Sequence, residues 1–457
     1  MEKRIPKKTY RNIMNSLGGG TVPREGLGYI AVGREKEIDS LLRDTEIIQD
    51  GGSTFRFVVG DYGSGKTFLL QTIKEYCVKN NFIVAEADLS PDRALIGNSA
   101  KKKGLAIYRE LMANVSNKTN QSGRALAKVL ESWVNNMFAR AAIQMSQNPF
   151  GETNIERIAE TLMLEDCAKL QSLAYGYEFT MGLHLFWKAS RTSDISEKMT
   201  GQENVLRWFR GEFKTNQEAK KELGINATVQ DENWFDYIIL WAQFFVLAGY
   251  KGFIVLIDEL AYICNTANGI TRQNNYEKIL MMYNAALQGK AENLGIIMSG
   301  IPKSIYDKKK GIFSYEAMRS RLSTGSYQDP SIVNMMTPII KILPLTREEM
   351  YVLLEKLAEI HAQLNEYEKV ITEDEMIDFV KLAYLKRETT FITPRTMIRD
   401  FIQILDVKRQ NPDKGIRDIL AAYRFAVDED ANYVQTECQF RYCGTAIPFL
   451  TVRSTAR

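Results

Sequence analysis

The chain has 457 residues, 45% of them hydrophobic, so it can bury substantial cores and two or three domains are expected. Its five cysteines are odd in number and scattered, and it has two histidines, which argues against a disulfide scaffold and against a Cys/His zinc site. The net charge of +3 does not by itself indicate a nucleic-acid-binding protein, because phosphate binding needs a concentrated basic surface.

Residues 1–50 are expected to form an N-terminal segment and a helix. Just before that helix the segment carries Tyr29-Ile30-Ala31-Val32-Gly33-Arg34-Glu35. Gly33 permits close approach of the backbone to a ligand. Arg34 is expected either to reach that ligand or to tie the segment to the core that follows.

Residues 51–89 are expected to supply the first two strands of an α/β core. The apolar strand Phe55–Val59 runs into a G-x-x-x-x-G-K-T loop, and Thr67–Lys79 has helical spacing, as a strand, loop and helix unit requires. In such a P-loop the glycines let the backbone wrap around phosphate oxygens, Lys66 reaches the β- and γ-phosphates, and Thr67 ligates Mg²⁺. ATP and Mg²⁺ are therefore the predicted cofactors. The candidate ATP-binding residues are Gly33, Arg34, Gly60, Asp61, Tyr62, Gly63, Ser64, Gly65, Lys66, Thr67 and Phe68.

Residues 90–250 follow the second strand, Phe82–Ala87, and are far more numerous than the roughly 10–12 residues of a minimal crossover. Their spacing is mostly helical, so we interpret them as a helical insertion. The predicted helices are Leu105–Val115, Ala125–Met145, Asn204–Phe213 and Trp234–Leu247. Five aromatic residues are expected in its core, with a partner or base-stacking surface as the alternative: Tyr175, Tyr177, Phe179, Phe186 and Trp187.

Residues 251–345 are expected to complete the ATPase core. The buried-strand pattern Phe253–Ile257 ends at Asp258 and Glu259, which is typical of a Walker B strand. Asp258 would hold Mg²⁺, and Glu259 would polarise the water that attacks the γ-phosphate. This adjacent acidic pair points to the additional-strand group of ATPases. The alternative is that the pair only caps the helix that follows.

Two further features of this segment, Ser299 and the pair Arg319 and Arg321, match AAA+ ATPases. The strand Leu294–Met298 ends at Ser299, a candidate sensor of the γ-phosphate, and Ile339–Leu343 is a predicted fifth strand. Arg319 and Arg321 lie where such proteins carry an arginine finger for a neighbouring subunit, although a basic helix face is the alternative. Glu277–Ala286 has helical spacing.

Residues 346–427 are expected to form a helical lid. Thr346 and Glu349 fit a capping box at its start. Arg395, in Thr393-Pro394-Arg395, is a candidate second sensor, with an ordinary solvated arginine as the alternative. The final segment, 428–457, has no clear period, and no function is assigned to it.

The chain resembles the ATP-binding proteins of bacteriophage-exclusion (BREX) systems, BrxD-like, a branch of the origin-recognition/STAND-type AAA+ ATPases. The resemblance covers most of residues 14–405. It rests on Gly19-Gly20-Thr21-Val22-Pro23 with Arg24 and Gly26, Val32-Gly33-Arg34-Glu35, the P-loop, Ala87-Asp88-Leu89-Ser90-Pro91, Trp208-Phe209-Arg210-Gly211-Glu212, Ala248-Gly249-Tyr250, Ile257-Asp258-Glu259-Leu260, Ser314-Tyr315-Glu316-Ala317, Pro344-Leu345-Thr346 and Thr393-Pro394-Arg395. It implies a cytoplasmic ATPase in bacterial defence against phage, often beside an Lhr-type helicase, and it places the V-G-R-E segment near the adenine.

These observations predict an ATP-hydrolysing AAA+ switch that assembles with copies of itself, with DNA or with a helicase partner. Two lysine runs, Lys101-Lys102-Lys103 and Lys308-Lys309-Lys310, are candidate DNA contacts, with solvated faces as the alternative, and any such contact is expected to be independent of sequence. The alternatives are a STAND-type signalling scaffold that oligomerises on ATP binding and an origin-recognition-like DNA-binding module. The longest apolar stretch, Trp234–Tyr250, is shorter than the roughly 20 residues of a membrane span and contains Asp236, so no membrane partner is expected and the expected location is the cytoplasm.

Overall fold

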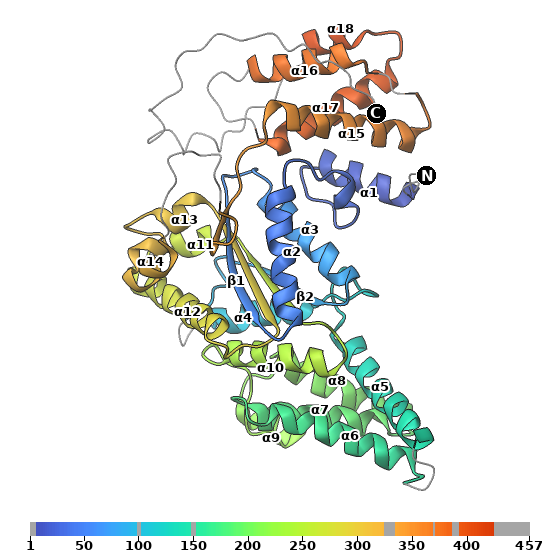
Figure 1. The fold of residues 1–457 in the computed structure, drawn as a ribbon, viewed down its shortest axis with the longest axis vertical. Coiled ribbons are helices and arrows are strands. Elements are labelled where there is room, and N and C mark those ends of the chain that lie inside the picture. The colour runs from blue at the N-terminus through green and yellow to red at the C-terminus, as the bar shows by residue number, and fades with distance from the viewer. Residues whose placement is uncertain are drawn as a thin grey trace.

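The computed structural model describes residues 6–97, 102–147, 152–323, 334–368, 371–385 and 393–424. In these ranges a five-stranded parallel sheet has the order β2-β3-β4-β1-β5 (Figure 1). Its strands are β1 (Ser53–Val59), β2 (Ile83–Asp88), β3 (Phe253–Asp258), β4 (Leu294–Gly300) and β5 (Ile339–Lys341). The sequence predicts all of these strands, with small differences at their ends.

Both faces of the sheet are buried, and neighbouring residues of a strand point into different cores. In β1, Phe57 packs into the core on one face and Val58 into the core on the other, as the two-residue repeat of a strand requires. The helices α2 (Glu35–Gln49) and α3 (Lys66–Lys79) cover the Val58 face. The other face is covered by α4 (Lys103–Ala113), α10 (Trp234–Leu247) and α12 (Gly269–Leu287).

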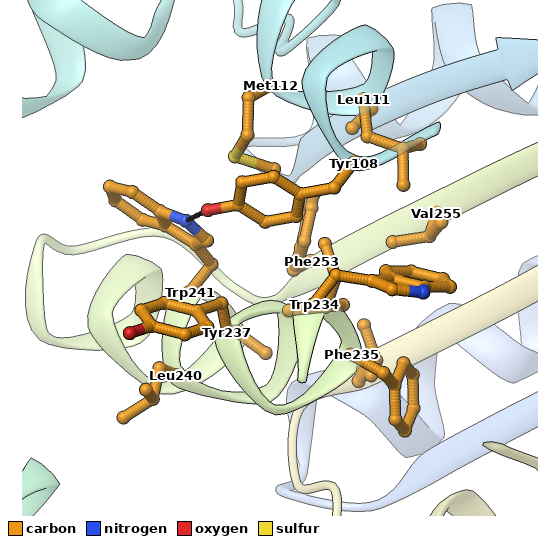
Figure 2. Close-up of a cluster of buried hydrophobic side chains, with 14 of the residues drawn as sticks. Tyr108, Leu111, Met112, Trp234, Phe235, Tyr237, Leu240, Trp241, Phe253 and Val255 are labelled. Atoms are coloured by element: carbon orange, nitrogen blue, oxygen red, sulfur yellow. Dashed lines mark hydrogen bonds between the residues drawn. The ribbon is translucent and has the colours of Figure 1, made fainter. Parts of the chain in front are cut away.

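The α10 helix joins the sheet to the helical insertion through a dense aromatic cluster. Figure 2 shows Tyr108 of α4 and the α10 aromatic residues beside Phe253 and Val255 of β3. The indole of Trp241 donates a hydrogen bond of 3.0 Å to the Tyr108 hydroxyl. Since α4 and α10 pack on the sheet itself, the helices of the insertion that extend away from the sheet are those between α4 and α10.

Those helices form one end of the molecule, opposite the lid (Figure 1). They are α5 (Leu126–Gln147), α6 (Ile155–Leu170), α7 (Gly176–Ser190), α8 (Ile195–Phe209) and α9 (Asn216–Leu223). The prediction of a helix over Asn204–Phe213 is wrong at its end, because α8 stops at Phe209 and Gly211 follows with φ +72°. Of the five aromatic residues expected in the core, Phe179, Phe186 and Trp187 are buried, whereas Tyr175 and Tyr177 are exposed.

The lid comprises α15 (Arg347–Asn365), α16 (Glu373–Leu385), α17 (Pro394–Gln410) and α18 (Ile416–Ala422). The predicted capping box is confirmed: Glu349 N donates to Thr346 Oγ1 at 3.1 Å and Thr346 N to Glu349 Oε2 at 2.8 Å. The predicted lid boundary at Val427 and the segment 428–457 lie outside the described residues.

The N-terminal helix α1 (Lys7–Gly18) packs with the lid, not with the sheet. Its apolar stripe, which includes Ile13 and Met14, is buried in the same core as residues of α15 and α17 (Figure 1). The predicted N-terminal segment 1–50 is therefore divided between two cores, since α2 packs on the sheet.

In the described ranges, five short helices connect the longer elements. They are η1 (Leu27–Tyr29), α11 (Ala261–Cys264), α13 (Pro302–Tyr306), η2 (Ile312–Ser314) and α14 (Glu316–Leu322). Among the described residues, none of the helices has the length and apolar character needed to cross a membrane.

Candidate nucleotide site

The loop between β1 and α3 has a backbone that only glycine adopts readily. Gly63 and Gly65 have φ +70° and +100°, in the left-handed region. A Cβ on Gly60 would lie 2.5 Å from Ser64 Oγ. Gly65 is the N-cap of α3 and gives the helix no side-chain cap. The first amides of α3 are thus left to bind an anion at the positive end of the helix dipole.

Lys66 lies inside the curve of this loop. Its ammonium donates to the carbonyl oxygens of Gly60 at 3.0 Å and Asp61 at 2.9 Å, and it lies 5.6 Å from the centre of the Tyr62 ring. Burial lowers the pKa of Lys66, and the negative charges of Asp258 and Glu259 oppose that shift. The cation and the two carboxylates therefore occupy one electrostatic site.

Asp258 is the centre of this site. Its Oδ2 accepts a 2.9 Å hydrogen bond from the Thr67 hydroxyl, and its Oδ1 accepts from the Ser299 hydroxyl and, at 2.7 Å, from the Glu259 amide. β3 and β4 are adjacent parallel strands, so their ends bring Asp258 and Ser299 together. The P-loop helix, β3 and β4 thus each supply one side chain to a single hydrogen-bonded cluster.

Glu259 has an unusual backbone. Its φ of +64° is in the left-handed region, which costs a non-glycine residue about 1–3 kcal/mol. Burial and the charge of Asp258 raise the pKa of Glu259, and Lys66 opposes the shift. Glu259 does not cap the next helix, because the N-cap of α11 is Leu260. Such a strained carboxylate beside a buried acid is typical of a functional position.

Asp88, at the end of β2, is a site residue that the sequence prediction missed. It is the register partner of Asp258 on the neighbouring strand. Burial and the Asp258 charge raise the pKa of Asp88, and Asp88 in turn helps to raise the pKa of Glu259. The signal was available in the sequence, because Asp88 directly follows the predicted strand Phe82–Ala87, but the pairing of β2 with β3 is needed to interpret it.

Arg34 ties the N-terminal segment to the core, which is one of its two predicted roles. Its guanidinium donates to Ser64 O at 3.0 Å, to Leu343 O at 2.9 Å and to Gly33 O at 3.0 Å. It is 5% exposed. Gly33 has φ +64°, and a Cβ there would lie 2.5 Å from the Glu349 carboxylate of the lid. One buried arginine therefore connects the P-loop with the chain that leads into the lid.

The lid itself touches the P-loop through the start of α17. A Cβ on Gly63 would lie 2.6 Å from Thr393 Cβ. Arg395, two residues further on, is exposed, and its positive charge acts on the pKa of both Lys66 and Glu259. Arg395 is therefore close enough to influence the site electrostatically.

The remaining predicted residues lie elsewhere. On α14, Arg319 pairs with Glu316, and Arg321 donates to Ala317 O at 2.8 Å; within the described ranges neither has a hydrogen bond or ion pair with the P-loop. Lys308, Lys309 and Lys310 follow α13 and are exposed. At the start of α4, Lys102 is exposed and donates to the Gln230 side chain, and Lys103 is half-buried. Lys101 lies outside the described residues.

The side chains present fit a nucleotide with Mg²⁺. The left-handed glycines leave the space that a backbone cradle for phosphates requires, and the Ser64 hydroxyl is buried without a partner among the described residues. Val32, Phe68 and Leu345 are half-buried beside the loop, in the core shared with the lid. Thr67 and Asp258 offer the two oxygen ligands that a Mg²⁺ ion takes from protein when phosphates and water complete its shell.

Comparison with known proteins gives one family. A family model described as BREX system ATP-binding protein BrxC/D matches residues 5–423, nearly the whole chain. A search of curated proteins found no match. The matched range includes every residue of the site described above.

Proposed function

The chain belongs to the family of BREX system ATP-binding proteins BrxC/D, and on that premise we propose that it is an AAA+ ATPase that hydrolyses ATP as a switch in bacterial defence against phage. The observation that carries the proposal is the Asp258 cluster. One carboxylate receives the hydroxyls of Thr67 and Ser299 while Glu259 stands beside it. The strained Glu259 backbone beside this carboxylate supports hydrolysis over nucleotide binding alone.

Two features of the fold support the AAA+ assignment. The strand β4 lies between the P-loop strand β1 and the Asp258 strand β3, as expected for the additional-strand group. A helical lid follows β5 and contacts the P-loop at Gly63. This arrangement suits a lid that closes over nucleotide and transmits hydrolysis as a rigid-body shift.

Each residue of the site has a role in the proposed reaction. The amides of the P-loop and Lys66 hold the phosphates, and Thr67 and Asp258 hold the metal. Mg²⁺, when bound, neutralises charge on the phosphate oxygens. Glu259 orients the attacking water and accepts its proton, while Ser299 and Arg395 report the γ-phosphate to the lid.

A neighbouring subunit would complete the site. Arg319 and Arg321 are exposed enough on α14 to serve another copy, and an arginine finger of this kind raises turnover by about 10³–10⁵ where measured. The proposed partners are copies of the same chain, DNA through the lysine runs, and a helicase of the Lhr type, with the cytoplasm as the expected location.

Substitution of Lys66 tests nucleotide binding. Lys66→Ala should weaken ATP binding at least about tenfold, because the phosphates lose their cation. Lys79→Ala, on the same helix α3 but 57% exposed, is the matched control and should bind as the wild type does. Equilibrium binding of a fluorescent ATP analogue gives both constants, and unchanged affinity in Lys66→Ala would refute the P-loop assignment. Loss of phage resistance in cells carrying Lys66→Ala would support the defence role.

A STAND-type signalling scaffold is the second candidate function. The observation that favours it is Arg34, since an arginine that joins the P-loop to the lid linker is suited to locking one conformation per nucleotide state. Slow hydrolysis that is indifferent to DNA, with assembly triggered by a protein ligand, would favour this scaffold over the motor-like switch.

A further inference from the structure

A concentrated basic surface lies at the carboxyl edge of the sheet. It consists of the basic loop, defined as Lys303, Lys308, Lys309 and Lys310, and of Arg272 near the start of α12. The four lysines are exposed, and Arg272 is half-buried. Within the described part of the chain none of these cations forms an ion pair, whereas Arg207 and Arg210 of the insertion are each held by glutamates. The charge of the basic loop is therefore available to an outside ligand.

The backbone of the basic loop is fixed from several sides. The Tyr276 hydroxyl donates to Lys310 O, and the Cys264 thiol to Lys303 O at 3.8 Å. A Cβ on Gly311 would lie 2.6 Å from Lys303 O, so the turn closes on itself. The main chain that carries these lysines is therefore already ordered before a ligand binds.

The acidic residue of this loop does not neutralise it. Asp307 Oδ1 accepts the amides of Lys309 at 2.7 Å and Lys310 at 3.0 Å, and these bonds and the nearby lysines lower the pKa of Asp307. Burial and Asp307 raise the pKa of Cys264, while Lys303, Arg272 and Lys310 oppose the shift. These three cations therefore gather around the end of α11.

Both short helices beside the basic loop start at the catalytic edge. The α11 helix begins at Ala261, just beyond Glu259, and α13 begins at Pro302, just beyond Ser299 and Gly300. The Leu260 amide donates to Ser299 O at 2.9 Å, so the two strand ends are joined. A displacement of α11 or α13 would reach Glu259 and Ser299 directly through the chain.

We propose that the basic loop and Arg272 bind the phosphate backbone of single-stranded DNA without sequence preference, and that α11 and α13 couple this binding to Glu259 and Ser299. Unpaired lysines suit phosphates, and the exposed Tyr262 of α11 offers a surface on which an unpaired base can stack. The DNA contact narrows the DNA partner of the proposed function to single strands at this loop, and the coupling rests on the proposed ATPase function.

The test compares full-length variants in binding a fluorescent dT oligonucleotide across a salt series. The variant K308Q/K309Q/K310Q removes three charges, and each phosphate contact on a single strand contributes about 0.7 to the slope of log K against log salt. We expect the slope to fall by about 2 and affinity at low salt to fall at least about tenfold. The variant K308R/K309R/K310R should bind as the wild type does.

A control that removes two lysine charges elsewhere on the surface tests for a general effect of net charge. K220Q/K221Q changes two exposed lysines on α9, far along the chain from the basic loop, and should keep the wild-type slope. Thermal melting of each variant verifies folding. An unchanged slope in K308Q/K309Q/K310Q would overturn the DNA contact, and equal affinity for duplex would overturn the single-stranded assignment.

The coupling has its own measurement. DNA should stimulate ATP turnover in the wild type, and the stimulation should be lost in K308Q/K309Q/K310Q at DNA concentrations that saturate the wild type. ATP hydrolysis that DNA does not change in the wild type would overturn the coupling while leaving the ATPase function intact. DNA binding without any ATP hydrolysis would instead refute the proposed function and leave the basic loop as a DNA contact.

Discussion

Arg34 joins the N-terminal segment, the P-loop and the chain that leads into the lid through one side chain. Its guanidinium satisfies carbonyl oxygens of Gly33, Ser64 and Leu343, and Glu37 lies 3.8 Å away and is equally buried. Burial lowers the pKa of Arg34, and Glu37 opposes that shift. Burying a cation costs little free energy while all of its hydrogen-bond partners are present, but removing one member of such a group is strongly destabilising.

Arg34→Ala should lower the free energy of unfolding by about 2–4 kcal/mol, because buried carbonyls and Glu37 lose their donor. Arg43→Ala, at an exposed position of the same helix α2, should change it by less than about 0.5 kcal/mol. Urea unfolding of both proteins measures the difference. If Arg34→Ala is as stable as Arg43→Ala, the carbonyl oxygens find other donors and Arg34 does not hold the P-loop to the chain that leads into the lid.

Gly63 is the second residue on which the lid and the P-loop depend. Gly63→Ala places a side chain at φ +70° and drives its Cβ into Thr393, so it should destabilise the protein by about 2–4 kcal/mol and weaken ATP binding. Gly224→Ala has the same kind of strain, at φ +72°, with nothing within 4 Å, and should cost about 1 kcal/mol. Urea unfolding and ATP titration of both variants separate the effect of backbone strain, which both share, from the effect of the Thr393 contact, which only Gly63→Ala has. If both variants behave alike, Thr393 does not press on the P-loop.

At the scale of elements, α1 is part of the lid although it lies at the opposite end of the sequence. Ile13 is fully buried in the lid core, and the linker that follows is held where Glu75 of α3 accepts the amides of Gly26 and Leu27. Any lid movement must therefore bend two connections: the linker from α1 to α2, which ends at Arg34, and the chain from β5 to α15, which Arg34 contacts at Leu343. The N-terminal helix would move with the lid.

Ile13→Ala should loosen the lid more than the sheet. The cavity should cost about 2–4 kcal/mol and speed hydrogen exchange in α15 and α17, with little change in α3. Ile47→Ala, at a position that is 42% exposed on α2, should leave all three helices protected as before. Uniform loss of protection across the molecule would contradict a separate lid core.

The elements also show what the sequence could and could not predict. Strands β1 and β3 are recognisable because short apolar runs end in the P-loop and in Asp258-Glu259, which are local signals. The helix α9 was not predicted, since NQEAKKEL buries only Ala219 and has no apolar stripe. The amphipathic face of α1 indicates that the helix packs, but not against which core. Asp88 escaped prediction because its place beside Asp258 depends on strand order.

At the scale of the whole molecule, the lid, the sheet and the insertion follow one another along the longest axis (Figure 1). The candidate nucleotide site, which includes the P-loop, lies at the carboxyl edge of the sheet on the side of the lid, as expected for open α/β folds. The insertion helices α5–α9 lie at the far end, away from this candidate site. A catalytic arginine from a second copy would have to approach the carboxyl edge.

Turnover per subunit should therefore rise with protein concentration. R319A/R321A should lose that rise, by a factor of about 10³ or more at high concentration if these arginines act in a neighbour. Arg157→Ala, which removes an exposed arginine of the insertion, should keep it. Phosphate release over a concentration series measures both, and a turnover number independent of concentration in the wild type would contradict catalysis shared between subunits.

The most direct test of ATP hydrolysis at the Asp258 cluster is a comparison of Glu259→Gln with the wild type in ATP binding and in steady-state phosphate release. The amide keeps the size of the side chain but cannot accept a proton. If Glu259 acts as the proposed base, Glu259→Gln should keep ATP affinity within about threefold of the wild type and reduce turnover about 10²–10⁴-fold. Turnover equal to that of the wild type would remove Glu259 from the reaction and contradict the proposed mechanism.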